Sequence, residues 1–349
     1  MKVIQVVKRF GLCGGMEEYA FRLTEELSKM GVKVKVLCEV QITKTQHQVE
    51  VIELGCSIKK PRWLSHLQFS KKVSKWVKNN ASRSVLIHSH ERISCHHVTT
   101  IHSTLFNFPK KGFPSLRKSI NEYLEKREMT CKSVQKVVPV SFMIANEIKD
   151  KFHIPDNKLC LPIPPGVSEI KVEKKIFNPE KPVIGFMGKE WKRKGLPKVI
   201  EIWREVRKQI VQTELCLAGF EPSEEIGLCE EEKEKVEIIG YVNDKASFYG
   251  KIDFLLHPAK KEAYGMVIAE ASKLGIPVFF SSECGISSDK SIISGTSISV
   301  REPTLLWANS ILAKIDSCGT PCKSKPCDWL DVSKRFKNIY NRILKEWGH

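Results

Sequence analysis

Several features that would place this 349-residue chain in a familiar class are missing from its sequence. No apolar run approaches the ~18 residues needed to span a bilayer. The segment Met1–Phe10 reads as a buried strand and lacks the apolar core and cleavage site of a signal peptide. Hydrophobic residues make up 42% and charged residues 28%, which excludes a disordered chain. We therefore expect a cytoplasmic globular protein.

The cysteines form neither a disulfide framework nor a zinc motif. They are scattered from Cys13 to Cys327, and no CxxC pair occurs. Cys318 and Cys322 lie close to Cys327, but the spacing matches no familiar zinc site. We expect free thiols in a reducing compartment.

Positive charge is in excess and is unevenly distributed. The chain has 57 Lys and Arg against 40 Asp and Glu, a formal net charge of +17. Residues 1–165 hold 28 basic and 14 acidic residues, whereas residues 166–349 hold 29 and 26. The excess in the first half indicates an anionic partner. Nucleic acid, an acidic membrane surface and a phosphorylated substrate all fit this composition.

Short β-rich apolar runs alternate with helix-patterned segments through both halves. This alternation and the chain length predict an α/β fold of two doubly wound, Rossmann-like domains that face each other across a cleft. The segment Leu161–Gly166 is the predicted linker, because its prolines end regular structure. The expected parts are a domain over residues 1–165, a domain over residues 166–328, and a helix over residues 329–349 that is free to pack back on the first domain.

The expected elements follow from these periodicities. The expected strands are Val3–Val7, Val32–Cys38, Val85–His88, Val98–His102, Val137–Ser141, Val183–Gly188, Leu215–Ala218, Val236–Ile239, Phe254–His257 and Val278–Phe280. The expected helices are Glu17–Met30, Ser65–Asn79, Ser115–Cys131, Ser141–Phe152, Leu196–Ile210, Ala246–Tyr249, Met266–Leu274, Thr304–Ile315 and Trp329–Trp347.

Two loops that follow expected strands have a composition that suits an anion. Phe10–Glu18 is rich in glycine and precedes a helix, so it fits either a phosphate site or a tight turn, although GxGxxG is absent. Gly188–Gly195 carries four cations before a helix, which suits a diphosphate, and a solvated charge run is the alternative. Both loops lie where open α/β sheets bind ligands.

Two carboxylates flank the start of another expected helix. Glu262 lies in the loop before it and Glu270 inside it, and Ala263–Val267 offer backbone N–H groups to an anion. Glu270 has apolar neighbours, so its burial would require a partner or a ligand. The alternative is a pair of surface glutamates.

A histidine, His102, ends an expected strand of the first domain. Such a residue is either structural or catalytic. His88, His90, His96 and His97 precede it, but their spacing matches no metal-ligand pattern, so we expect no metal site.

In combination, these motifs resemble the family 4 retaining glycosyltransferases of GT-B fold. The resemblance rests on Gly14-Gly15, on Lys194 and on the E-x7-E pair of Glu262 and Glu270. The run Phe254–Ala271 is similar in particular to bacterial lipopolysaccharide core glucosyltransferases. The resemblance covers nearly the whole chain and is strongest in the second domain.

The resemblance implies a role for each motif. Lys194, with Arg193 or Lys189, would bind the donor diphosphate, and Glu270 would bind the ribose. Glu262, Lys194 and His102 would be catalytic, with His102 near the transferred sugar. The residues that would bind the donor are Gly14, Gly15, Lys189, Arg193, Lys194, Tyr241, Val242, Ala263, Tyr264, Gly265, Met266, Val267 and Glu270.

The resemblance implies the transfer of a hexose, glucose in the resembling family, from a UDP-sugar to the lipopolysaccharide core or a related envelope glycan, with retention of configuration. A DxD motif is absent, so cations would replace a metal on the diphosphate, and no cofactor is expected. The alternatives are a nucleotide-sugar epimerase of the same fold and a transferase with a different lipid-linked or soluble acceptor.

The basic first domain would bind a phosphorylated, lipid-linked glycan acceptor. Phe106–Lys118 mixes aromatic residues with four cations, which suits an anionic membrane surface. We expect peripheral association with the inner face of the cell membrane, and the alternative is an acceptor loop that never touches lipid. No nucleic-acid reader motif occurs, so nucleic acid is not an expected partner.

Overall fold

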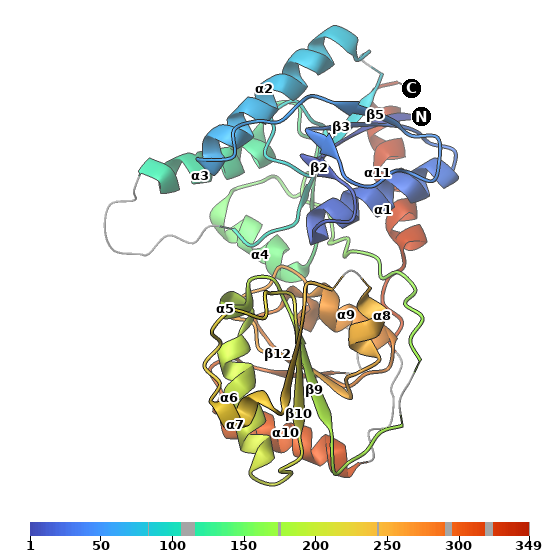
Figure 1. Ribbon diagram of the computed structural model, residues 1–349. Helices are drawn as coiled ribbons and strands as arrows, with labels where there is room; N and C mark the ends of the chain where they lie inside the picture. The colour runs from blue at the N-terminus through green and yellow to red at the C-terminus, as the bar shows by residue number, and fades with distance from the viewer. Residues whose placement is uncertain are drawn as a thin grey trace. The chain divides into compact units, whose positions relative to one another are not determined.

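The chain forms two compact units, which we describe separately. The first unit comprises Met1–Gly166 and Cys327–His349, and the second unit comprises Val167–Pro326. Figure 1 shows a parallel sheet with flanking helices in each. The computed structural model describes residues 1–82, 84–105, 116–173, 176–242, 244–289, 295–317 and 324–348.

The first unit is built on a parallel sheet of order β5-β3-β1-β6-β7-β8. Its strands are β1 (Lys2–Val6), β3 (Lys33–Cys38), β5 (Glu50–Glu53), β6 (Leu86–Ser89), β7 (Val98–Ile101) and β8 (Lys136–Pro139), with a small ladder of β2 (Arg9–Phe10) and β4 (Val40–Gln41). Its helices are α1 (Gly15–Lys29), α2 (Arg62–Asn80), α3 (Leu116–Thr130), α4 (Phe142–Lys151) and α11 (Trp329–Glu346). The strand order reverses between β1 and β6, which is where sheets of this kind bind ligands.

Alternate residues of β1 are buried on opposite faces of this sheet. Ile4 and Val6 pack with Phe69 and Val73 of α2. Gln5 points to the other face, where it contacts α11. Helix α11 packs against α1, so the last helix of the chain lies beside the first one (Figure 1).

The second unit repeats this plan with a parallel sheet of order β11-β10-β9-β12-β13-β14. Its strands are β9 (Val183–Met187), β10 (Glu214–Ala218), β11 (Val236–Gly240), β12 (Phe254–His257), β13 (Val278–Ser281) and β14 (Gly295–Ile298). Its helices are α5 (Trp191–Lys194), α6 (Leu196–Arg207), α7 (Glu230–Lys233), α8 (Lys245–Tyr249), α9 (Met266–Lys273) and α10 (Thr304–Asp316), with a short 3-10 helix at Gly285–Ser288. Here the order reverses between β9 and β12.

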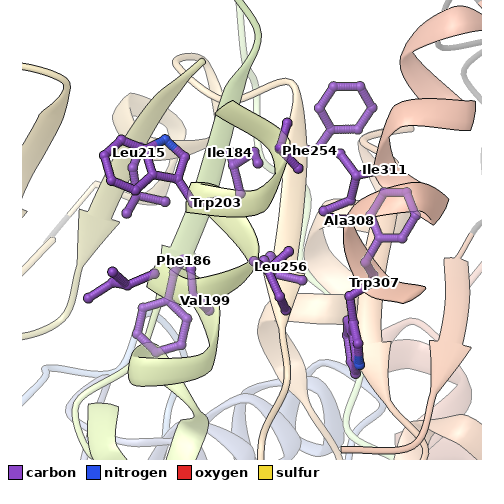
Figure 2. Packing of buried hydrophobic residues seen from close by; sticks show 14 of the residues in the cluster. Ile184, Phe186, Val199, Trp203, Leu215, Phe254, Leu256, Trp307, Ala308 and Ile311 are labelled. Atoms are coloured by element: carbon purple, nitrogen blue, oxygen red, sulfur yellow. The ribbon is translucent and has the colours of Figure 1, made fainter. Parts of the chain in front are cut away.

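Two fully buried tryptophans anchor the core of the second unit. Trp203 of α6 and Trp307 of α10 lie over the same face of the sheet, against Phe186 of β9 and Leu256 of β12 (Figure 2). A buried side chain of this size stabilises a fold by a few kcal/mol, roughly 3 on transfer scales. Beneath this core, β9 and β12 pair in parallel at Ile184–Phe254 and Gly185–Leu255.

The observed topology confirms the expected α/β class with two Rossmann-like halves. Strand β12 has the predicted bounds, whereas the edge strands β5 and β14 were not predicted. The chain leaves the first unit after Gly166 and returns to it at Cys327. Most of the aromatic and basic segment Phe106–Lys118, and also Cys318 and Cys322, lie outside the described residues.

No helix in the described part of the chain is both long and apolar enough to cross a membrane.

Candidate active site

A glycine pair shapes the loop that follows β9. Gly195 has φ +91°, and a Cβ there would lie 2.1 Å from the carbonyl oxygen of Pro258, so only glycine allows this approach to the end of β12. A Cβ on Gly188 would lie 2.5 Å from Cδ of Lys194. The Lys194 side chain therefore lies across Gly188, at the position where the strand order reverses.

Two cations from this loop meet one carboxylate from the loop after β12. The Nζ atom of Lys194 lies 3.5 Å from Oε2 of Glu262, and Nη1 of Arg193 lies 3.4 Å from the same oxygen. Arg193 also pairs with Glu190 at 2.5 Å and donates to the carbonyl of Lys261. The side chains of Lys194 and Glu262 are 20% and 17% exposed, so both remain within reach of a ligand.

The backbone around Glu262 is held by the loop after β13. The amide of Glu262 donates to the carbonyl of Glu283 at 3.2 Å, and the amide of Gly285 donates to the carbonyl of Glu262 at 2.9 Å. The amide of Ile286 likewise donates to the carbonyl of Tyr264 at 2.9 Å. These bonds fix the segment that leads into α9.

Helix α9 begins directly after this segment. Its N-cap is Gly265, with φ +114°, and no side chain of the described residues caps it. Met266 and Val267 form its first turn and are half-buried. Ala263 and Tyr264 are buried, and the Tyr264 hydroxyl bonds Asp289 at 3.3 Å. An uncapped helix start presents backbone N–H groups, which bind anions such as phosphate.

The second carboxylate of the pair is buried and satisfied by the protein. Glu270 is 3% exposed. Lys245 donates to its Oε1 at 2.6 Å, and the Tyr249 hydroxyl donates to its Oε2 at 2.7 Å. This excludes the alternative of two surface glutamates and supplies the partner that burial requires. Each carboxylate oxygen has a second lone pair that can accept from a ligand hydroxyl.

Three further predicted residues of the second unit follow strand ends. Lys189 follows β9 and is exposed. Tyr241 and Val242 follow β11, and Tyr241 is 53% exposed. They lie at the same edge of the sheet as Lys194 and Glu262, because parallel strands end on one side.

The glycine-rich turn of the first unit forms the start of α1. Gly14 is the N-cap in an extended conformation, and a Cβ there would meet the Glu17 carboxylate at 2.4 Å. Arg9 pairs with that carboxylate at 2.5 Å. Gly15 has open space where its Cβ would be. The turn thus combines a close internal approach at Gly14 with an accessible backbone at Gly15.

His102 lies at the end of β7, in contact with a second histidine. Its Nε2 lies 2.9 Å from Nδ1 of His90. The ring of Tyr19 packs edge-on against it, with centroids 4.8 Å apart. Burial lowers the pKa of His102 to about 3, so its ring is neutral at pH 7.

The described residues contain no group of three His, Cys, Asp or Glu side chains that could hold a metal ion. The neighbouring histidines instead hydrogen-bond within the protein: His88 to Thr100 and His96 to the carbonyl of Glu128.

Two family models match the chain, one over each part of this geometry. The model described as Glycosyltransferase Family 4 matches residues 13–169, and the model described as Glycosyl transferases group 1 matches residues 167–289. Between them they span the glycine-rich turn, His102, the Lys194 loop and the start of α9. The chain belongs to the family 4 type glycosyltransferases of GT-B fold.

Solved structures share this fold over nearly the whole glycosyltransferase chain. WaaG, a glycosyltransferase involved in lipopolysaccharide biosynthesis, matches with a TM-score of 0.77 and 16% identity, over 98% of both chains. HepE from Anabaena, in complex with UDP and glucose, matches with a TM-score of 0.71 and 16% identity, over 98% of this chain and 100% of that chain. At such identities the likeness is one of fold.

A curated relative matches a shorter stretch of the glycosyltransferase. The O-antigen biosynthesis glycosyltransferase WclY from Escherichia coli is 33% identical over 92 residues. The match spans 26% of this chain and 26% of that protein, so it covers about a quarter of the relative's length.

Sequence reasoning missed several residues that shape the two sites. Lys245 and Tyr249 hold Glu270, but they lie 25 and 21 residues away in the sequence, with no motif that links them. Gln5 and Tyr340 belong to the histidine cluster of the first unit. A signal for Gln5 was present, since it is the polar residue in the otherwise apolar run Val3–Val7.

Proposed function

We propose that this glycosyltransferase moves a hexose, glucose in our proposal, from a UDP-sugar to an envelope glycan with retention of configuration. The observation that carries the proposal is the Lys194–Glu262 pair beside the uncapped start of α9, at the point where the strand order of the second unit reverses. Cations and a free helix start together suit a nucleotide diphosphate. The complex of HepE with UDP and glucose supports the choice of donor.

In this proposal the donor binds along the carboxyl edge of the second sheet. Lys194 and Arg193, with Lys189, bind the diphosphate, and the N–H groups of Met266 and Val267 bind its oxygens. Glu270 accepts hydrogen bonds from the ribose, and the exposed Tyr241 with Val242 contacts the base. The backbone of Ala263–Gly265 contacts the donor sugar.

The glycine-rich turn of the first unit has an accessible backbone at the start of α1. We propose that Gly14 and Gly15 bind a phosphate group there, because Gly15 has open space where a Cβ would lie. His102 would contact the transferred sugar as a neutral ring.

The proposed chemistry is the departure of a diphosphate with positive charge developing on the sugar. Lys194 and the start of α9 stabilise the negative charge on the leaving group. Glu262 holds Lys194 in place and contacts the donor sugar. The bond between the anomeric carbon and the diphosphate oxygen breaks as the acceptor oxygen attacks from the same face, and the acceptor's proton passes to the departing diphosphate. This gives retention without a covalent nucleophile, and the protein supplies the electrostatics without a metal.

For the acceptor we propose a phosphorylated, lipid-linked glycan of lipopolysaccharide type. The basic excess of the first half of the chain supports an anionic acceptor. The similarity to WclY and to WaaG supports an envelope glycan, since these proteins act in O-antigen and lipopolysaccharide biosynthesis. We further propose that the first unit associates with the inner face of the membrane.

The test is donor turnover with purified protein. UDP-, GDP- and ADP-sugars are offered with and without deacylated lipopolysaccharide core, and nucleotide release is measured. We expect UDP release that depends on the acceptor. Lys194→Ala should lower kcat by about 10²- to 10³-fold, the range seen when one charge-stabilising group is removed.

Lys192→Ala is the matched control, because Lys192 lies in the same short helix and its ammonium packs over Trp191. It should keep near-wild-type turnover. Conversion of the donor without an acceptor would instead indicate an epimerase. No acceptor-dependent release from any donor, with the protein folded, would contradict a transferase with this acceptor.

A further inference from the structure

A chain of hydrogen-bonded polar side chains runs through the interior of the first unit and ends at His102. It joins strands β1, β6 and β7 to helix α11. Its members, in order, are Thr100, His88, Tyr340, Gln5, His90 and His102. Apart from His102, which is half-buried, each of them is at most 3% exposed.

The first half of this chain fixes the side-chain amide of Gln5. Nε2 of His88 lies 2.7 Å from the Thr100 hydroxyl, and Nδ1 of His88 lies 2.6 Å from the Tyr340 hydroxyl. The Gln5 amide nitrogen donates to that same hydroxyl at 3.3 Å. An order consistent with these contacts has Tyr340 accepting from Gln5 and donating to Nδ1 of His88, and Nε2 of His88 donating to Thr100.

The contacts of Gln5 with His90, and of His90 with His102, then determine which ring nitrogen of His102 carries the proton. Oε1 of Gln5 lies 2.9 Å from Nε2 of His90, and an amide oxygen can only accept. His90 must therefore carry its proton on Nε2, which leaves its Nδ1 as an acceptor. Nε2 of His102 lies 2.9 Å from that atom, so it must donate.

This order requires neutral rings, because a charged imidazole would donate from both nitrogens. Burial lowers the pKa of His88 and His90 well below the ordinary histidine value, and that of His102 to about 3. The rings are also packed in place: the centroids of His88 and His90 lie 4.4 Å apart, and Phe336 lies 4.8 Å from His88.

We propose that Gln5, His90 and Tyr340 are positioning residues that hold His102 in the tautomer with its proton on Nε2. The Nδ1 atom, which bonds no described residue, is then a permanent hydrogen-bond acceptor. The catalytic meaning rests on the proposed function: His102 would accept a hydrogen bond from a sugar hydroxyl and could not donate one at that atom. Tyr340, which lies 238 residues after His102 in the sequence, thus sets which nitrogen of a site residue carries the proton.

The direct test is NMR of protein labelled with ¹⁵N-histidine, in which long-range ¹H–¹⁵N spectra show which ring nitrogen carries the proton. The His102→Gln variant assigns the signals of His102. We expect the neutral Nε2–H pattern at pH 7. A proton on Nδ1, an equal mixture of tautomers or a charged ring in the wild type would overturn the proposal.

Variants then test whether the buried, hydrogen-bonded side chains set the tautomer of His102. Tyr340→Phe removes the hydroxyl that orients Gln5, and Gln5→Met removes the acceptor that orders His90, so both should convert His102 to a mixture of tautomers. Gln5→Glu keeps an acceptor toward His90 and should restore the Nε2–H form. Either of the first two variants suffices if the other fails to fold.

The matched control is Tyr19→Phe, which makes the same chemical change in another buried tyrosine of the same unit. The Tyr19 ring contacts His102, but its hydroxyl donates to the carbonyl of Ile163, which is not a member of the hydrogen-bonded series from Thr100 to His102. The His102 tautomer should stay unchanged. If Tyr340→Phe also leaves the His102 tautomer unchanged, the hydrogen-bonded side chains do not position His102.

The spectra need no substrate, so the proposal and the proposed function can fail separately. With turnover established, Tyr340→Phe should lower kcat about tenfold, the worth of one hydrogen bond, with little change in KM for the donor. Ordered tautomers without any turnover would contradict the function and leave the positioning role intact. Turnover with a disordered His102 would contradict the positioning role alone.

Discussion

His257, the last residue of β12, is a buried polar side chain that the protein leaves unsatisfied. It is fully buried, its ring stacks on Phe186, and neither nitrogen bonds any described residue. Burial, followed by the positive charges of Lys194 and Arg193, lowers its pKa well below the ordinary value. The buried histidine at this position therefore lowers the free energy of unfolding, and it lowers that free energy further as the pH falls.

We predict that His257→Leu stabilises the protein, and that the gain grows as the pH falls. Below about pH 6.5 the unfolded chain binds a proton at His257 that the folded chain does not bind, so the wild type loses up to about 1.4 kcal/mol per pH unit. Leucine removes this loss and the unpaired nitrogens. Urea unfolding at pH 7.5, 6.5 and 5.5 measures the difference.

The exposed His153 provides the control for this comparison. His153→Leu should leave the pH dependence of the unfolding free energy like that of the wild type. A gain for His257→Leu that is equal at all three pH values would contradict the assigned neutral ring.

Single residues also show what sequence could and could not predict about the site. Lys194 and Glu262 were each predicted to bind a ligand, because each follows an apolar strand that is recognisable from its composition, but their contact with each other was not predicted. The partners of Glu270 were not predicted, since Lys245 and Tyr249 reach it only through the packing of α8 against α9. Contacts of this kind depend on tertiary structure rather than on local pattern.

Helix α11 is the element whose role was hardest to assign in advance. Its apolar stripe was visible in the sequence, but a stripe does not name the surface that covers it. In the structure the helix packs on α1, with Asp328 as its N-cap, bonded to the amide of Asp331 at 2.8 Å. The predicted stripe comprises Trp329, Val332, Phe336, Ile339 and Ile343, and all of these except the half-buried Ile339 are buried. Tyr340, which was not part of the predicted stripe, is buried as well.

We predict that Phe336→Ala destabilises the protein by about 3 to 5 kcal/mol, the cost of removing a large aromatic side chain from a core. Phe336 is fully buried and contacts both Tyr19 and His88. Equilibrium unfolding in urea measures the change. Lys334→Ala, on the exposed face of the same helix, should change stability by less than about 0.5 kcal/mol. Equal effects of the two variants would contradict this packing.

The strands divide into predictable and unpredictable ones for a physical reason. Central strands such as β12, with sequence Phe-Leu-Leu-His, are buried on both faces and read as apolar runs. The edge strands β5, Glu-Val-Ile-Glu, and β14, Gly-Thr-Ser-Ile, are partly exposed and carry polar residues. The edge strands β8 and β11 were predicted from their apolar runs, so it is the polar composition of β5 and β14, and not their edge position, that prevented their prediction.

At the scale of the whole molecule, the basic excess of the first half has a structural location. Helix α2 carries exposed Lys71, Lys75 and Lys78, and α3, which contacts α2, carries exposed Arg117 and Lys118. A cluster of this kind attracts anionic surfaces within a Debye length of about 10 Å at 0.1 M salt. It supports the proposed membrane association independently of the segment 106–115.

We predict that vesicles containing anionic lipid sediment the protein at low salt and release it near 0.5 M salt. Each basic residue near such a surface contributes about 1 kcal/mol, so replacing Lys71, Lys75 and Lys78 by glutamine should weaken binding by 10²-fold or more. Vesicles of zwitterionic lipid are the control. Sedimentation of the protein with anionic vesicles that depends neither on salt nor on these lysines would contradict an electrostatic attachment.

The whole-molecule architecture was the most predictable level. Alternation of strand and helix patterns along the chain is a global signal, and it requires no single contact to be correct. The division of the chain into units follows its prolines at one boundary, near Gly166. The second boundary, at Cys327, has no equally strong marker in the sequence.

The return of the chain to its first unit has a consequence for synthesis. The sheet of that unit is encoded before residue 166, but Tyr340, which orders the buried histidines, is made only after the whole second unit has been synthesised. A nascent chain therefore holds Gln5 and His88 without their partner for most of its elongation. Translation that stops before α11 therefore leaves His88 and Gln5 of the first unit without the Tyr340 hydroxyl.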